Sequence, residues 1–133
     1  MVAALKESVI PALRSKGFSG SFPHFRRIRT TQIDLLSFQF SMWGGQFAVN
    51  LHACGPDGYT DYSGTHISPK KVKADDIGGT IHFRLGAKPP EQTDHWFRFD
   101  PPEEGIYARV AAEVLPLVES QAEEYWLKRE QKN

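Results

Sequence analysis

Hydrophobic residues near both ends of the chain recur at the spacing of an α-helix. Leu5, Val9 and Leu13 fall on one side of a helix over residues 2–16, and most charged residues there fall on the other side. A second apolar stripe predicts a longer helix that starts near Asp100 and bends at Pro116. Each helix therefore needs one apolar surface to cover.

The central part of the chain alternates between apolar and polar residues, which is typical of half-buried strands. Residues 32–41 and 46–54 flank Gly44-Gly45, and a two-residue turn there predicts a hairpin. In that register Phe38 faces Leu51 and Phe40 faces Val49, so one side of the hairpin is apolar. The same register pairs the polar residues Gln39 with Asn50 and Ser37 with His52 on the other side.

Shorter strands are predicted on both sides of this hairpin. A turn at residues 30–31 would place Phe25 opposite Leu36 and His24 beside Ser37, and further strands are expected at 79–85 and 95–100. Residues 55–65 are typical of a loop. The order of elements predicts an α+β single domain over 1–133, with a mostly antiparallel sheet of about five strands. The N-terminal and C-terminal helices should pack on one face and leave the polar face open.

Composition narrows the classes of function. Sixteen basic and sixteen acidic residues give a net charge of zero, which makes general nucleic-acid binding unlikely. Cys54 is the single cysteine, so no intramolecular disulfide can form and a reducing compartment is indicated. Neither a signal peptide nor an apolar stretch of about 20 residues is present. The sequence therefore favours a cytoplasmic protein without membrane association.

The expected open face gathers the candidate ligand-binding residues. Amide, imidazole and guanidinium groups beside an aromatic ring suit an anionic or planar ligand, although a plain solvated sheet face would need polar residues too. If the late strands are neighbours, Arg84 and Arg98 lie close together and favour an anion between them. The candidates are Gln39, Asn50, His52, Arg84, Trp96 and Arg98.

Catalytic and metal chemistry has weaker support. Ser37 has no carboxylate on its own face, since Asp34 has the opposite parity, and the five histidines lack the close spacing of a zinc site. No cofactor or metal is expected. The leading hypothesis is a non-enzymatic binding or interaction module that uses the open polar face to bind an anionic small molecule or a protein partner. The alternative is a small enzyme acting on an anionic small molecule, with His52 as acid/base.

Three segments together resemble a known family. They are the stretch from Gly17 to Arg27, the stretch from Ile33 to Phe47 with its Trp43-Gly44-Gly45 turn, and Trp96 to Phe99 before the last helix. The chain is similar over nearly its whole length to the bacterial family known as domain of unknown function 4304. The resemblance implies a single-domain bacterial protein and supplies no activity, cofactor or catalytic residue.

Overall fold

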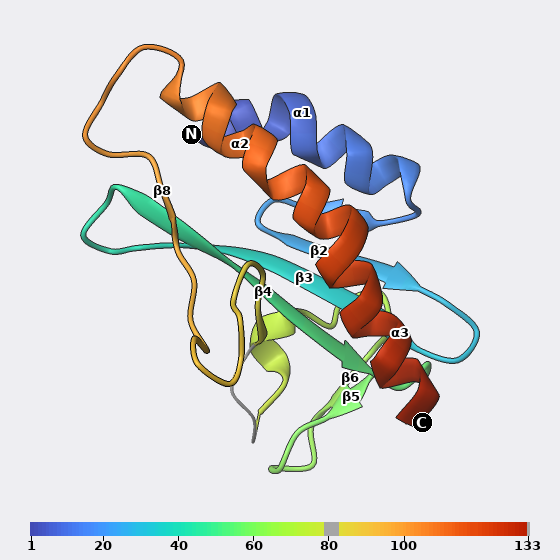
Figure 1. Cartoon of the computed structure of the whole chain (residues 1–133). Coiled ribbons are helices and arrows are strands. Elements are labelled where there is room, and N and C mark those ends of the chain that lie inside the picture. The colour runs from blue at the N-terminus through green and yellow to red at the C-terminus, as the bar shows by residue number, and fades with distance from the viewer. Residues whose placement is uncertain (79–82, 133) are drawn as a thin grey trace.

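A computed structural model describes residues 1–78 and 83–132 of the chain (Figure 1). Three α-helices lie near the two ends of the chain, and the last two are joined by a π-helical segment. The helices are α1 (Val2–Ser15), α2 (Ile106–Leu117), the π-helix η2 (Val118–Ala122), α3 (Glu123–Lys132) and the short 3-10 helix η1 (Ala74–Asp76). The strands are β1 (Ser19–Ser21), β2 (His24–Ile28), β3 (Ile33–Phe40), β4 (Gln46–Cys54), β5 (Tyr59–Thr60), β6 (His66–Ile67), β7 (Phe83–Arg84) and β8 (Phe97–Arg98).

The main sheet is antiparallel and has six strands, which confirms the predicted α+β class. Its order is β1-β2-β3-β4-β7, and β8 also pairs with β4. Strands β7 and β8 therefore share one edge of β4, where Arg84 lies opposite Asn50 and Arg98 lies opposite Gln46. Strands β5 and β6 form a separate two-stranded ribbon.

The helices cover one face of the sheet, as predicted (Figure 1). Leu5, Val9 and Leu13 of α1 are fully buried, as expected from their helical spacing. Trp126 of α3 is fully buried as well, and its indole Nε1 donates to the carbonyl of His52 at 3.0 Å. Each large apolar side chain buried in this way contributes about 1.5–3 kcal/mol. The sheet side of this core is Phe25, Leu36, Phe38, Phe47, Val49, Leu51 and Phe97.

The β3–β4 hairpin has the predicted faces but not the predicted register. Its loop contains four residues instead of two, because the Ser41 amide donates to Gln46 and the Gly44 amide donates to Ser41. Phe38 therefore lies opposite Val49, two residues away from the predicted partner. A shift of two residues leaves every side chain on its original face, which is why the apolar stripe still forms the core. The predicted pairing of β2 with β3 is confirmed, including Phe25 with Leu36.

The second face of the sheet is covered, so the prediction that it lies open is wrong at its centre. Residues 55–78 fold back beneath β3 and β4, and Val72, Ala74 and Ile77 pack against Ile33 and Leu35 (Figure 1). The polar residues of this face, Ser37, Asn50 and His52, are all buried. The physical reason is that β3 also places the apolar side chains of Ile33 and Leu35 on this face, and these are stabilised by burial away from water.

Two late elements are shorter than the sequence pattern predicts: the second long helix, and the strand expected over 95–100, of which β8 covers Phe97–Arg98. The described part of the strand expected over 79–85 is β7, and residues 79–82 lie outside the described residues. The second long helix begins at Ile106, after Gly105 in a left-handed conformation (φ 76°), and not near Asp100. Past Pro116, the α-helix gives way to the π-helical segment, in which Ser120 Oγ donates to the Pro116 carbonyl.

Candidate functional site

Four of the six predicted ligand-binding residues meet on the second face of the sheet. The Arg84 guanidinium lies over the Trp96 ring, 4.8 Å from its centroid, and its Nη2 is 3.5 Å from Gln39 Oε1. The same Gln39 oxygen accepts a hydrogen bond from Asn50 Nδ2 at 2.9 Å. Asn50 is buried, and its Oδ1 has no hydrogen-bond partner among the residues that the structure describes. We call this group the Arg84 cluster.

Asp94 completes the Arg84 cluster and was missed in the sequence. Its Oδ1 lies 3.5 Å from Arg84 Nη1, and its Oδ2 accepts from Trp96 Nε1 at 3.1 Å. Asp94 precedes Trp96 by two residues, so strand alternation could have placed both on one face. The charge of Arg84 is therefore balanced within the protein, without an external anion.

Arg98 and His52 do not belong to the Arg84 cluster. Arg98 pairs with Gln46, four positions along β4 from Asn50, a separation of about 13 Å. Its Nε is 3.5 Å from the carboxylate of Asp100. The two late strands follow one another along the same edge of β4, so Arg84 and Arg98 are not side by side. His52 lies on the same face, two positions beyond Asn50 along β4, where it is buried opposite Leu35.

His24 and Cys54, the other potentially reactive side chains on this face, have the properties of structural residues. His24 Nδ1 lies 2.8 Å from Ser37 Oγ, and burial lowers the pKa of His24 below 6.5. Burial, together with the charge of Asp34, raises the pKa of the Cys54 thiol to about 11, so the thiol is protonated at neutral pH. Within residues 1–78 and 83–132, no three His, Cys, Asp or Glu side chains are grouped as metal ligands.

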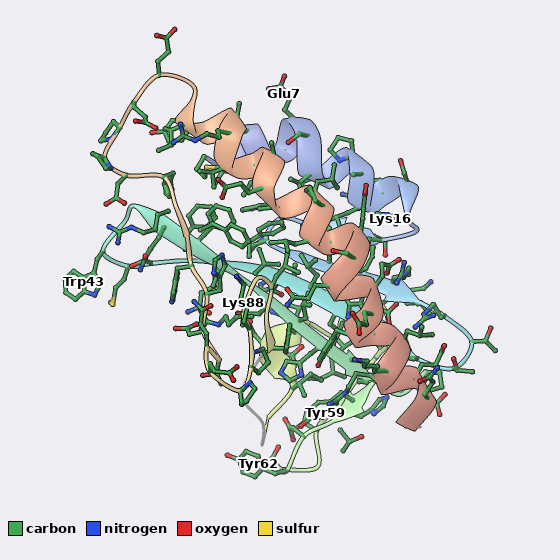
Figure 2. All side chains as sticks on the ribbon, viewed as in Figure 1. Glu7, Lys16, Trp43, Tyr59, Tyr62 and Lys88 are labelled. Carbon is green, nitrogen blue, oxygen red and sulfur yellow. The ribbon has the colours of Figure 1, made fainter. Side chains whose placement is uncertain are left out.

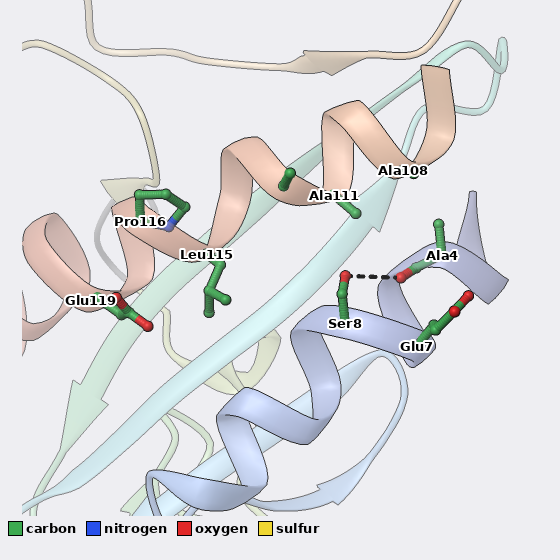
Figure 3. A pocket seen from close by; sticks show the side chains of 9 residues that line it. Ala4, Glu7, Ser8, Ala108, Ala111, Leu115, Pro116 and Glu119 are labelled. Carbon is green, nitrogen blue, oxygen red and sulfur yellow. Dashed lines mark hydrogen bonds between the residues drawn. The ribbon is translucent and has the colours of Figure 1, made fainter. Parts of the chain in front are cut away.

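A groove lined mostly by apolar side chains lies between α1 and α2, and it was not predicted (Figure 3). It has a volume of about 530 Å³. Ala4 and Ser8 of α1 form one wall, Ala108 and Ala112 of α2 form the other, and Leu115 points into the space between the helices. The complete lining is Ala4, Glu7, Ser8, Ala108, Ala111, Ala112, Leu115, Pro116 and Glu119. We call it the α1–α2 groove.

The α1–α2 groove opens on the side of the helices that faces away from the sheet. In α1, Ala4 and Ser8 immediately precede Leu5 and Val9, which are buried in the core. Helical geometry turns consecutive residues by about 100°, so these wall residues lie beside the buried stripe, with Ser8 exposed and Ala4 partly buried. The signal in the sequence was the small, uncharged character of an outer helix surface that would usually carry charged side chains.

Large apolar side chains are also exposed at the tips of two turns. Trp43, at the end of the β3–β4 hairpin, is 89% exposed, and Tyr62 projects from the loop between β5 and β6 (Figure 2). Tryptophan and tyrosine are enriched among the residues that dominate the energy of protein interfaces. Met42, which precedes Trp43, is exposed as well, so the tip of the hairpin carries two adjacent apolar side chains.

The fold and the groove together describe an α+β protein whose helical layer carries an apolar recess. The chain belongs to the family described as Domain of unknown function (DUF4304), whose model matches residues 9–128. A search among curated proteins found no match, and neither did a search among solved structures. No helix within the described ranges is both long enough and apolar enough to span a membrane.

Proposed function

We propose that this protein is a non-enzymatic binding module that holds a segment of a protein partner in the α1–α2 groove. The observation that supports this most strongly is the groove itself, a solvent-facing recess of about 530 Å³. Most of its lining residues are Ala, Leu or Pro. Apolar recesses with a few polar groups at the edge are the usual form of binding sites.

The groove has the character of a binding surface and lacks catalytic groups. Its one hydroxyl, Ser8 Oγ, donates to the Ala4 carbonyl at 3.1 Å, and no histidine or cysteine lines it. A nucleophile would need a base within hydrogen-bond reach. The alternative enzyme would use His52, which is buried and does not line the α1–α2 groove.

A protein partner is favoured over an anionic small molecule. An anion at the Arg84 cluster would have to compete with Asp94, which already lies beside Arg84 and accepts a hydrogen bond from Trp96. The α1–α2 groove requires no such displacement. The free Cys54 thiol supports a cytoplasmic location.

The test is a selection of peptides from a random display library on the wild-type protein. Ala112→Trp fills the groove from an exposed position, and Glu113→Trp is the matched control because it lies on the same helix but outside the groove. Circular dichroism should show that both variants are folded. Selected peptides should bind the control like the wild type and lose at least about tenfold in affinity for Ala112→Trp. The proposal fails if no peptide is enriched, or if both variants bind equally.

A further inference from the structure

Two carboxylates stand at the rim of the α1–α2 groove. Glu7 of α1 and Glu119 of η2 lie toward opposite ends of the groove, and both are exposed (Figure 3). Neither forms a salt bridge in the part of the chain that the structure describes. No Lys or Arg lines the groove. The rim therefore presents negative charge with no counter-charge from the groove itself.

The dimensions of the groove suit a short helix. The wall formed by α2 and the start of η2 extends from Ala108 to Glu119, which corresponds to about 16 Å or three helical turns. The alanines and the serine of the two walls have small side chains, so the backbone of an incoming segment can approach the helices closely. An amphipathic helix laid in an apolar groove is a recurring mode of peptide recognition, with anchors spaced three or four residues apart.

Resting on the proposed function, we infer that the occupant is an amphipathic helix of a partner protein with an apolar stripe flanked by Lys or Arg. The apolar stripe would contact Ala108, Ala112 and Leu115, which are exposed or partly exposed in the groove. The basic residues at its two ends would meet Glu7 and Glu119. Complementary charge of this kind sets orientation and selects between partners, because like charges at the same positions repel.

Other occupants fit the rim less well. An anionic membrane surface would be repelled by Glu7 and Glu119, since such surfaces attract Lys and Arg. In a second copy of this chain, the exposed apolar residue of α3 is Leu127, whose neighbours Glu124 and Lys128 already pair at 2.8 Å. Of the basic residues next to Leu127, Lys128 therefore already has a carboxylate partner on its own helix.

The experiment takes the peptides whose binding is lost in Ala112→Trp and synthesises each with Lys or with Glu at both flanks. Affinity is measured by fluorescence anisotropy for the wild type and for Glu7→Lys/Glu119→Lys. The wild type should prefer the Lys form by about tenfold, the effect expected of two exposed ion pairs. The double variant should prefer the Glu form, and raising the salt concentration should reduce both preferences.

The outcomes separate this inference from the proposed function. The inference of a basic helical partner fails if groove-dependent peptides bind equally well with either flank charge, or if the wild type prefers Glu flanks. It also fails if NMR shows that the peptides bind in an extended conformation. In each of these cases the proposed binding module still stands. Absence of any groove-dependent peptide would overturn both. Sedimentation of the protein alone provides the remaining check, because a dimer that Ala112→Trp abolishes would make a second copy the occupant.

Discussion

The two faces of the sheet are both buried, but by different means. Helices cover one face, where stacked aromatic rings such as Phe47 and Phe97, 5.2 Å apart between centroids, fill the space. A folded loop segment covers the other, where a small apolar cluster around Leu35 lies beside the polar residues Ser37 and Asn50. Two adjacent residues of one strand can therefore be equally buried in very different surroundings.

The charged groups at the two faces differ in the same way. On the helical face, Asp34 is fully buried and lies 2.8 Å from Arg27, which also contacts Glu123 and the rings of Phe18 and Trp126. On the loop-covered face, the partner of Arg84 is the exposed Asp94. The difference indicates that the helical face carries most of the stability, and that the loop-covered face is held by weaker, more local contacts.

Leu36 and Leu35 give the most direct test, because they are neighbours in β3, both fully buried, and on opposite faces. Leu36→Ala should lower the free energy of unfolding by about 4 kcal/mol, near the upper end for such changes, because the aromatic core cannot collapse into the cavity. Leu35→Ala should cost about 2–3 kcal/mol, because the loop segment can relax. Urea denaturation measures both, and equal losses would contradict the distinction.

Substitutions of Asp34 and Asp94 test how much the ion pairs on the two faces of the sheet contribute to stability. Asp34→Asn should cost about 3 kcal/mol in the free energy of unfolding, because Arg27 and Arg29 would both lose the buried carboxylate that they share. Asp94→Asn should cost less than about 1 kcal/mol, because exposed pairs are screened by solvent. Thermal and chemical denaturation provide the values. A loss at Asp94 as large as that at Asp34 would show that the Arg84 cluster stabilises the fold.

Ser37 tests the buried polar row of the loop-covered face. Ser37→Ala should cost about 1 kcal/mol, because it removes the hydroxyl that contacts His24 Nδ1 inside the protein. Thr60→Ala is the matched control, since Thr60 Oγ1 makes a similar contact with His66 Nδ1 at 2.9 Å on an exposed hairpin. The control should change stability by less than about 0.5 kcal/mol. If both substitutions cost the same, burial of the Ser37 contact adds nothing.

His24 predicts a small dependence of stability on pH. Because burial lowers its pKa below 6.5 in the folded protein, the unfolded chain binds the proton more readily. The contribution of neutral His24 to the free energy of unfolding is therefore present above pH 6.5 and is lost as the pH falls toward the folded pKa. The free energy of unfolding should fall less steeply from pH 7 to pH 5 in His24→Gln than in the wild type. Parallel pH profiles for the two proteins would exclude this contribution.

The alternation of apolar and polar residues along the strands correctly predicted the sheet face on which each side chain lies. It did not predict which side chains are exposed to solvent. It placed Phe38 and Val49 in the core even though the hairpin loop was assigned two residues too few. It also brought Gln39, Asn50 and Arg84 to one surface, where they do meet. It could not indicate that this surface is covered, because the covering residues lie in a segment with no periodic pattern of its own.

The sequence by itself determined the helices, the antiparallel hairpins and the face on which each side chain lies. These are local properties, set by the repeat of the helix and of the strand, and a two-residue slip does not alter them. Only the tertiary structure decided that β7 and β8 share one edge of β4, which separates Arg98 from Arg84. It also created the α1–α2 groove, because the two walls come from opposite ends of the chain and meet only when both helices pack on the same sheet.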